Sequence, residues 1–332
     1  MPLLDIKNLR TTFSIQAGTV RAVRGLDLTV DYGESVGIVG ESGSGKSVSM
    51  LSVMGLLPVN AHLSADSIMF DGRELMGMDE REKRRMHGKE IGMVFQDPMT
   101  SLNPLYTIGM QLMEPIRIHM GLDKKKARER ALEMLRLVNI PSPESRLKQY
   151  PHEFSGGMRQ RVMIAIALAC NPKLIIADEP TTALDVTIQA QILELMQDLK
   201  SKLNTSIIMI THDLGVIASM CSRIVVMYGG CVAETGTTRE IFYEPKHPYT
   251  WGLLRSIPKA SIDGTHEKLV PIPGTPPDML KPPKGCPFAP RCPYAMRVCR
   301  EYMAPQTVLS DTHKVACHLM HKNAPHVERG EV

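Results

Sequence analysis

A glycine-rich segment near the start of the chain has the residue types that bind phosphate. The segment Gly40-Glu41-Ser42-Gly43-Ser44-Gly45-Lys46-Ser47 fits the pattern G-x-x-x-x-G-K-[ST], between an apolar run at 35–40 and a helical pattern. Its glycines let backbone N–H groups converge on phosphate oxygens, and the following helix adds its positive N-terminal dipole. We therefore expect a nucleotide site in which Lys46 holds the β- and γ-phosphates and the Ser47 hydroxyl ligates Mg²⁺.

Two adjacent carboxylates supply the second half of such a site. Leu174-Ile175-Ile176-Ala177 predicts a buried strand, and Asp178 and Glu179 follow it directly. Asp178, at the carboxyl end of this strand, is expected to hold Mg²⁺ through water. Glu179 follows at the position where a carboxylate can orient and deprotonate an attacking water. The alternative is that both acids are simply exposed to solvent at the end of the strand and have no function. The presence of the phosphate loop in the same chain makes this interpretation less favoured.

Alternating strands and helices must position these groups. Buried-strand candidates lie at 35–40, 91–95, 174–177, 206–210 and 224–227. Helical patterns separate several of them, which indicates a parallel sheet covered on both faces. Two further β-rich runs open the chain at 3–6 and 26–30, and the second alternates apolar with polar residues, as a half-solvated antiparallel strand does.

The middle of the chain predicts helices alone. Residues 124–138 place apolar side chains at helical spacing, and residues 159–170 are apolar on most sides. No strand is expected between residues 95 and 173. We interpret about 97–172 as a helical subdomain inserted into an α/β core.

The composition limits the class of protein. At about 150 residues per domain, 332 residues indicate roughly two domains. Lys plus Arg is 39 and Asp plus Glu is 35, and a formal charge of only +4 argues against a dedicated nucleic-acid binder. The start of the chain has no basic segment followed by an apolar stretch. The longest apolar run, at 162–170, is shorter than the about 20 residues of a membrane span. We expect a soluble, cytoplasmic chain whose membrane role is peripheral.

The last quarter of the chain is unusual in composition. Fourteen of the 24 prolines lie at or after Pro245, and four of the seven cysteines fall between residues 286 and 317. Proline-rich stretches at 271–277 and 281–285 are incompatible with a helix or a central strand. We therefore divide the chain into a domain at 1–243 and a C-terminal extension at 244–332.

Four cysteines in the extension have a spacing that suggests a metal group. The thiols are Cys286, Cys292, Cys299 and Cys317. Stable disulfides are disfavoured in a reducing cytoplasm. Structural zinc sites mostly use closer cysteine pairs than these. Four thiolates suit a [4Fe–4S] cluster, and proline follows Cys286 and Cys292 as it often follows cluster cysteines. The cluster is our first expectation, with Zn²⁺ and unliganded thiols as the alternatives.

A further motif separates this chain from other phosphate-loop proteins. Phe154-Ser155-Gly156-Gly157-Met158-Arg159-Gln160-Arg161 resembles the L-S-G-G-Q-x-Q-R signature of ABC (ATP-binding cassette) ATPases. The order of the motifs along residues 1–240 is similar to the whole cassette. The resemblance implies an α/β P-loop NTPase fold with a RecA-like parallel-sheet core, an antiparallel β subdomain and an inserted α-helical subdomain. The Pro/Cys-rich C-terminal extension follows it.

The resemblance also implies roles for single residues. Gln96 matches the glutamine that senses Mg²⁺ and the attacking water, and Glu179 matches the catalytic base. His212, in Thr211-His212-Asp213, matches the histidine that contacts the γ-phosphate. Asp185, in Ala183-Leu184-Asp185, matches an aspartate at the dimer interface. Phe13 is the candidate for stacking on adenine, with Val20 as the alternative contact.

The signature opens a helix and therefore forms a second anion site. Ser155, Gly156 and Gly157 supply its N-terminal N–H groups. In the family two cassettes pair head-to-tail, so this site would close on the ATP held by the partner. Met158 stands where the family has glutamine. The missing amide is expected to weaken hydrogen bonding to that ATP by about 1 kcal/mol.

A finer resemblance is to the ATP-binding subunits of dipeptide and oligopeptide importers. The stretches that carry it are 40–47, 95–104 (Phe-Gln-Asp-Pro-Met-Thr-Ser-Leu-Asn-Pro), 150–158, 179–186 and His247-Pro248-Tyr249-Thr250 with the tail that follows. It implies an ATPase that powers peptide import from the cytoplasmic face of the membrane. Related importers of nickel, glutathione or other small solutes share much of the pattern, so they remain alternatives.

The same resemblance implies partners. They are a second ABC ATPase subunit, which we expect to be a different chain, two integral-membrane permease subunits and, indirectly, an extracytoplasmic peptide-binding protein. A permease helix is expected to dock in a groove near Gln96. A soluble ABC ATPase acting on nucleic acid is the competing class. The near-neutral charge and the single cassette disfavour it, and we expect no nucleic-acid partner.

Overall fold

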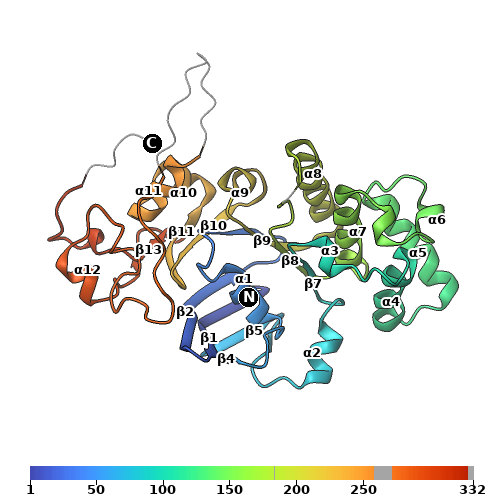
Figure 1. The fold of residues 1–332 in the computed structure, drawn as a ribbon, viewed down its shortest axis with the longest axis horizontal. Coiled ribbons are helices and arrows are strands. Elements are labelled where there is room, and N and C mark those ends of the chain that lie inside the picture. The colour runs from blue at the N-terminus through green and yellow to red at the C-terminus, as the bar shows by residue number, and fades with distance from the viewer. Residues whose placement is uncertain (183, 258–270, 328–332) are drawn as a thin grey trace, which may run out of the picture. The chain divides into compact units, whose positions relative to one another are not determined.

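The computed structural model describes residues 1–182, 184–257 and 271–327 (Figure 1). The chain divides into two compact units, each built from several segments. The first unit contains residues 1–2, 30–35 and 77–210, and the second contains residues 3–29, 36–76 and the chain from 211 onward. Within the described ranges, no helix has both the length and the apolar character needed to cross a membrane.

An antiparallel sheet forms part of the second unit. Its strands are β1 (Leu4–Ile15), β2 (Gly18–Val30), β4 (Ala61–Ser64), β5 (Ser67–Phe70) and β6 (Arg73–Glu74). The order is β2-β1-β5-β6, with β4 also paired to β1. The runs expected at 3–6 and 26–30 are the most buried parts of strands that extend much further. The expected antiparallel subdomain is thus present.

The other strands of this unit form both parallel and antiparallel pairs. β3 (Ser35–Val39) lies parallel to β10 (Arg223–Tyr228), and β10 is antiparallel to β11 (Cys231–Thr237). The strands β13 (Lys314–Val315) and β12 (Thr307–Val308) come from the C-terminal extension and continue the order beyond β11, with β12 at the edge. The helices of this unit are α1 (Lys46–Val53), α9 (Leu214–Met220), α10 (Thr238–Tyr243), α11 (Pro248–Arg255), α12 (Arg297–Glu301) and the short η2 (His318–Met320).

Three parallel strands lie in the first unit. They are β7 (Ile91–Val94), β8 (Leu174–Asp178) and β9 (Ser206–Thr211), and β8 pairs with both of the others. Every residue of β8 and β9 is buried, which explains their uninterrupted apolar sequence. The backbone of α7 (Gly156–Leu168) lies against β7 so closely that a Cβ on Gly92 would be 2.5 Å from the Ala167 carbonyl oxygen.

The segment between β7 and β8 is helical, as the sequence predicts. Its helices are α3 (Pro98–Ser101), α4 (Ile108–Met120), α5 (Lys124–Leu137), α6 (Pro143–Arg146), η1 (Pro151–Glu153) and α7. All residues from 95 to 173 are described, and none of them is in a strand. Thr107, Asp123 and Ser155 cap α4, α5 and α7 by accepting a backbone N–H of the first turn. The remaining helices of the unit are α2 (Glu80–Met86) and α8 (Val186–Leu203).

The C-terminal extension is more regular than its composition predicts. The proline-rich stretches at 271–277 and 281–285 form neither helix nor strand, as expected. Nevertheless α11 forms, because Pro248 stands at a helix start, where proline is tolerated, and His247 caps it. β11 was also missed by the sequence pattern. It follows β10 through Gly229 and Gly230, which both have positive φ and allow a tight turn.

Candidate functional site

The phosphate loop has a backbone that requires glycine. Gly40, Gly43 and Gly45 have φ of 152°, 76° and 98°. A Cβ on Gly40 would lie 2.1 Å from the Met227 carbonyl oxygen, and one on Gly45 would lie 2.6 Å from the Ala22 carbonyl oxygen. The loop leads directly into α1, whose N-terminus has no side-chain cap. Its first N–H groups can therefore bind an anion.

Lys46 and Ser44 are the buried polar side chains of this loop. Lys46 is only 5% exposed, and its Nζ donates to the carbonyl oxygens of Gly40 (2.7 Å) and Glu41 (3.1 Å). Ser44 is 3% exposed, and its Oγ has no hydrogen-bond partner among the described residues. A buried hydroxyl of this kind is costly unless a ligand satisfies it. The other two serines of the motif lie where the sequence predicts them. Ser42 is in the loop, and Ser47 is in the first turn of α1.

The structure brings two of the expected catalytic side chains into contact in the first unit. Gln96 Nε2 donates to Glu179 Oε2 at 3.1 Å. Thr182 Oγ1, which sequence reasoning missed, donates to the same oxygen at 2.9 Å. Asp178 ends β8 and is 7% exposed. The carboxylates of Asp178 and Glu179 thus follow the strand as predicted, and Glu179 is the one held by side-chain amide and hydroxyl donors.

Glu179 also has an unusual backbone conformation. Its φ is 46°, in the left-handed region that residues other than glycine rarely adopt, and its N–H donates to the Ile210 carbonyl oxygen at 2.8 Å. Such conformations cost of order 1–3 kcal/mol and concentrate at functional sites. Nothing in the residue types around Glu179 predicts this conformation.

The signature residues lie at the start of α7. Ser155 and Gly156 are exposed, and Ser155 Oγ accepts the N–H of Met158 at 3.4 Å. A Cβ on Gly157 would lie 2.7 Å from Ile188 Cγ2, so this glycine allows α7 to approach α8. Asp185 caps α8 by accepting the Ile188 N–H at 3.0 Å. Ala183 of the same motif lies outside the described residues.

The remaining expected residues lie on or directly after strands. His212 follows β9 and is exposed, and Asp213 beside it caps α9. Phe13 is half-buried on β1, opposite Ala61 of β4. Val20, the alternative for the adenine contact, is half-buried on β2.

Two residues of the C-terminal extension, Tyr249 and Arg291, contact the phosphate loop. Arg291 forms an ion pair with Glu41, and the Tyr249 hydroxyl accepts the Glu41 N–H at 2.8 Å. Tyr249 belongs to the His-Pro-Tyr-Thr stretch that the resemblance singled out. Arg291 stands next to Cys292, but no sequence signal connects it with the loop.

The four cysteines of the extension lie in one neighbourhood. The Cys286 N–H donates to the Cys299 carbonyl oxygen at 2.8 Å. Burial, with smaller contributions from the neighbouring thiols, raises the pKa of Cys286 to about 11 and that of Cys317 to about 12. Burial also raises the pKa of Cys292. Across the described part of the chain, no group of three or more His, Cys, Asp or Glu side chains is arranged to hold a metal ion.

Comparisons with known proteins place the chain in a family. Residues 23–182 match the model of the ABC transporter family, and residues 233–299 match the model of the oligopeptide/dipeptide transporter C-terminal region. The chain is 55% identical to the oligopeptide transport ATP-binding protein OppD of Bacillus subtilis, over 99% of this chain and 92% of the relative. It is 53% identical to the dipeptide transport ATP-binding protein DppD of the same organism, over 98% and 96%.

Solved structures show the same fold. The dimeric post-hydrolysis state of the ATP-binding cassette MJ0796, bound to ADP and Pi, matches with a TM-score of 0.64 and 30% identity, over 71% of this chain and 99% of the other. The cassette cbiO1 of Clostridium perfringens matches with a TM-score of 0.63 and 28% identity, over 73% and 91%. The predicted ABC cassette fold is confirmed.

The fold and the phosphate loop therefore define an ATPase cassette of the ABC transporter class. Within that class, the chain belongs to the family of oligopeptide and dipeptide transport ATP-binding proteins, as its identity to OppD and DppD over nearly its whole length shows. The resemblance read from the motifs is confirmed.

Proposed function

We propose that this chain is the ATPase subunit that powers import of di- and oligopeptides across the cytoplasmic membrane. One observation carries the substrate class. The region after the cassette matches the C-terminal model of oligopeptide/dipeptide transporters over residues 233–299. The chain would bind the cytoplasmic face of its permeases as a peripheral subunit. The absence of a membrane-crossing helix among the described residues is compatible with this location.

Uptake by the assembled transporter tests this proposal. The chain, its second ATPase and its two permeases are reconstituted in vesicles with the peptide-binding protein. ATP is supplied on the side of the ATPase subunits. We expect ATP-dependent uptake of a labelled di- or oligopeptide, and none with the chain omitted. Uptake of nickel or glutathione without peptide uptake would contradict the proposed substrate.

We assign the nucleotide contacts by residue. Lys46 and the N–H groups of the loop at 40–47 would bind the phosphates. Ser47, Gln96 and Asp178 would hold Mg²⁺, and their hydroxyl, amide and carboxylate oxygens are the donors that this cation prefers. The bound cation would neutralise phosphate charge. Asp178, which ends β8, is 7% exposed, and a bound cation would offset the cost of burying its charge.

Glu179 is proposed as the general base, with Gln96 orienting it and His212 contacting the γ-phosphate. The hydrogen bonds from Gln96 and Thr182 orient the carboxylate of Glu179, which would accept the proton of the attacking water. We expect Glu179→Gln to lower kcat by about 10²–10⁴-fold while ATP still binds. Glu194→Gln, on the exposed side of α8, is the matched control. Hydrolysis at the normal rate in Glu179→Gln would exclude the role.

Two cassettes are proposed to pair head-to-tail. Ser155, Gly156 and Gly157 are exposed or half-buried at a helix start, where they would contact the partner's ATP. Asp185 would lie at the same interface, and Phe13 would stack on the adenine. The partner is proposed to be a different ATPase chain.

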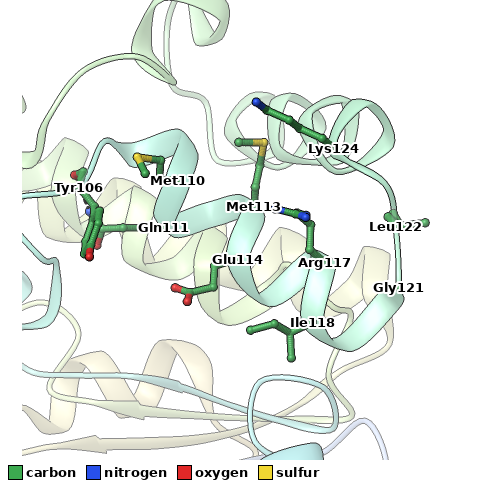
Figure 2. A pocket seen from close by; sticks show the side chains of 10 residues that line it. All are labelled: Tyr106, Met110, Gln111, Met113, Glu114, Arg117, Ile118, Gly121, Leu122 and Lys124. Atoms are coloured by element: carbon green, nitrogen blue, oxygen red, sulfur yellow. Dashed lines mark hydrogen bonds between the residues drawn. The ribbon is translucent and has the colours of Figure 1, made fainter.

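A hollow on α4 is proposed as the permease docking site. It has a volume of about 800 Å³ and is lined by Tyr106, Met110, Gln111, Met113, Glu114, Arg117, Ile118, Gly121, Leu122 and Lys124. Figure 2 shows that most of these side chains come from α4, with Tyr106 before it and Lys124 at the start of α5. Met110 and Ile118 are 53% and 68% exposed, which is unusual for apolar residues so close together. A cytoplasmic helix of a permease, with an apolar face and charged ends, suits these side chains.

The hollow is also connected with the segment that follows Gln96. Gln111 exchanges hydrogen bonds with the backbone of Asn103 and donates to the Tyr106 carbonyl oxygen, each at 2.9 Å. These bonds fix the loop between α3 and α4. A helix docked on α4 would therefore act on a rigid segment that begins near Gln96.

A [4Fe–4S] cluster held by Cys286, Cys292, Cys299 and Cys317 is proposed for the extension. The four thiols are buried or half-buried, and the other three contribute to the raised pKa of Cys317. The cluster would crosslink, and so stabilise, a segment whose own hydrophobic core is small.

Metal analysis tests this assignment. We expect anaerobically purified protein to be brown and to contain about four iron atoms, and Cys292→Ser to lose both. Cys221→Ser, a buried cysteine outside the extension, is the control and should remain brown. A colourless protein with stoichiometric zinc would contradict the proposal.

The division into a cassette at 1–243, with its helical subdomain at about 97–172, and an extension at 244–332 is retained as a proposal. The ABC transporter model ends at residue 182, and the model of the C-terminal region spans residues 233–299 and so includes this boundary.

A further inference from the structure

Arg291 of the C-terminal extension binds the side chain of Glu41 in the phosphate loop. Its Nη1 and Nη2 donate to the two carboxylate oxygens at 2.5 Å and 3.0 Å. The two residues are 250 positions apart in the sequence. Bidentate pairs of this kind are geometrically specific, because the planar guanidinium matches the carboxylate. The side chains of Arg291 and Glu41 are 5% and 25% exposed, so the pair is largely shielded from solvent.

Every N–H donor of this guanidinium is used. Besides Glu41, Arg291 donates to the carbonyl oxygens of Pro273 (2.7 Å) and Ile272 (3.0 Å) and to the Tyr228 hydroxyl (3.0 Å). A guanidinium has five such donors, so its orientation is fixed completely. It cannot leave Glu41 without breaking bonds to the extension. The pair is therefore a rigid link rather than a mobile surface contact.

The backbone of Glu41 is held from the same side. Its N–H donates to the Tyr249 hydroxyl at 2.8 Å. The Tyr249 ring packs against Tyr228 and Phe288, with centroid distances of 4.5 Å and 5.3 Å. Both the side chain and the N–H of Glu41 thus bind residues beyond the motif. The carbonyl oxygen of Glu41 accepts from Lys46, so the position of Glu41 also affects the lysine that would bind phosphate.

We propose that Arg291 is a positioning residue for nucleotide binding, which acts through Glu41 to keep the phosphate loop in its binding conformation. The inference rests on the nucleotide role proposed above for the loop. Without the link, the loop would occupy that conformation for only a fraction of the time. The apparent Kd for ATP rises in inverse proportion to this fraction. The C-terminal extension would in this way set the nucleotide affinity of the cassette.

Nucleotide binding by the full chain tests the proposal. The Kd for Mg-ATP is measured by calorimetry for the wild type, Arg291→Ala and Arg291→Lys, with thermal unfolding measured in parallel. We expect about a 10-fold higher Kd for Arg291→Ala and a smaller rise for Arg291→Lys, which keeps the charge but loses the bidentate geometry. Arg297→Ala is the control, because Arg297 is in the same extension, pairs with Glu301 and is 91% exposed.

The route through Glu41 is tested by a double-mutant cycle. Glu41→Gln alone should raise the Kd for Mg-ATP. The double variant Arg291→Ala/Glu41→Gln should have a Kd no higher than that of the single variant with the higher Kd. Additive effects would overturn the route through Glu41. In the assembled transporter, we expect the KM for ATP to rise with little change in kcat.

The outcomes separate this inference from the proposed function. A wild type that does not bind ATP would contradict the function itself. A wild type that binds ATP, with Arg291→Ala and Glu41→Gln binding equally well and only unfolding earlier, would show a purely structural role and overturn the inference. If Arg291→Ala does not fold, Arg291→Lys and Glu41→Gln decide between these outcomes.

Discussion

Glu179 shows how single residues of the site depend on contacts that no motif describes. Its carboxylate accepts hydrogen bonds from Gln96 and Thr182, and its backbone has a left-handed φ of 46°. The residue types predicted a carboxylate after β8 and a glutamine after β7. They could not predict that these two side chains bind each other, because that contact depends on the pairing of β7 with β8.

Met158 is the residue of the signature that departs from the family pattern. It is half-buried in the first turn of α7, directly behind the Ser155 cap. We expect Met158→Gln to raise the ATPase rate of the assembled transporter about fivefold, because an added amide contributes about 1 kcal/mol of hydrogen bonding to the partner's ATP.

Steady-state ATPase measurements on the complex check this prediction. Met303→Gln adds the same amide at an exposed position of the extension and should leave the rate unchanged. An unaltered ATPase rate in Met158→Gln would show that the methionine does not weaken the interaction of the signature with the partner's ATP.

Helices and strands with a long or uniform apolar pattern were predicted correctly from the sequence. Elements with a short or weakly alternating pattern were missed. The helices α5 and α7 and the strands β8 and β9 lie within a few residues of their expected bounds, since each has a continuous apolar face or run. The strand β11 was missed because its sequence alternates weakly, and its place is set by the turn from β10. The helix α11 was missed because prolines surround it, although its cap and first residue are favourable.

The phosphate loop gives a prediction at the level of an element. We expect Gly40→Ala to abolish detectable ATP binding and to lower the Tm. Its Cβ would lie 2.1 Å from the Met227 carbonyl oxygen, so the loop and β10 cannot both keep their positions. Gly72→Ala is the control for the backbone conformation alone. Gly72 has φ +75° with nothing within 4 Å, so it should cost about 1–2 kcal/mol and leave ATP binding intact.

Calorimetry with Mg-ATP and a thermal unfolding curve for each variant check this prediction. Normal ATP affinity in Gly40→Ala would mean that the loop binds phosphate in another conformation.

The cap of α11 gives a pH prediction. His247 is fully buried, and burial lowers its pKa from 6.5 to about 4, against an opposing effect of Glu234. Its Nδ1 accepts the Tyr249 N–H at 3.0 Å, so the folded chain requires the neutral ring. Because the folded-state pKa is depressed, the stabilisation is complete above about pH 6.5 and is lost as the pH falls toward 4. Between pH 7 and pH 5 the loss should be about 2 kcal/mol.

Urea unfolding at the two pH values checks the loss. Asn can cap the helix without titrating, so His247→Asn should lose about 2 kcal/mol less than the wild type over this interval. Glu234 accepts the backbone N–H of His247, and it also pairs with His313 at 2.8 Å. Equal pH slopes for both proteins would contradict the prediction.

At the scale of the whole molecule, the second unit joins distant parts of the chain in one core. Glu234 of β11 is completely buried and pairs with His313, near the end of the described residues. The extension therefore shares its polar interior with the cassette. The sequence predicted a boundary near residue 243 from composition, and composition does not reveal such contacts.

Assembly with the membrane subunits gives the prediction at this scale. We expect Ile118→Asp to weaken assembly with the permeases at least 10-fold, because a carboxylate would be buried unpaired in the hollow on α4. ATP binding and the Tm of the isolated subunit should not change, since Ile118 is 68% exposed there. Val59→Asp, at a fully exposed residue outside the hollow, is the control.

Co-purification with the tagged permeases, followed by peptide uptake, measures the effect. Complete assembly and uptake with Ile118→Asp would place the docking surface elsewhere.

The strand β13 has a consequence for how the chain avoids self-association. It pairs with β11 and with β12, and it thereby covers main-chain groups of β11 that would otherwise face solvent. An uncovered sheet edge is a template for strands of other molecules. A chain without the extension would present that template. We therefore expect the extension to prevent self-association through this sheet edge.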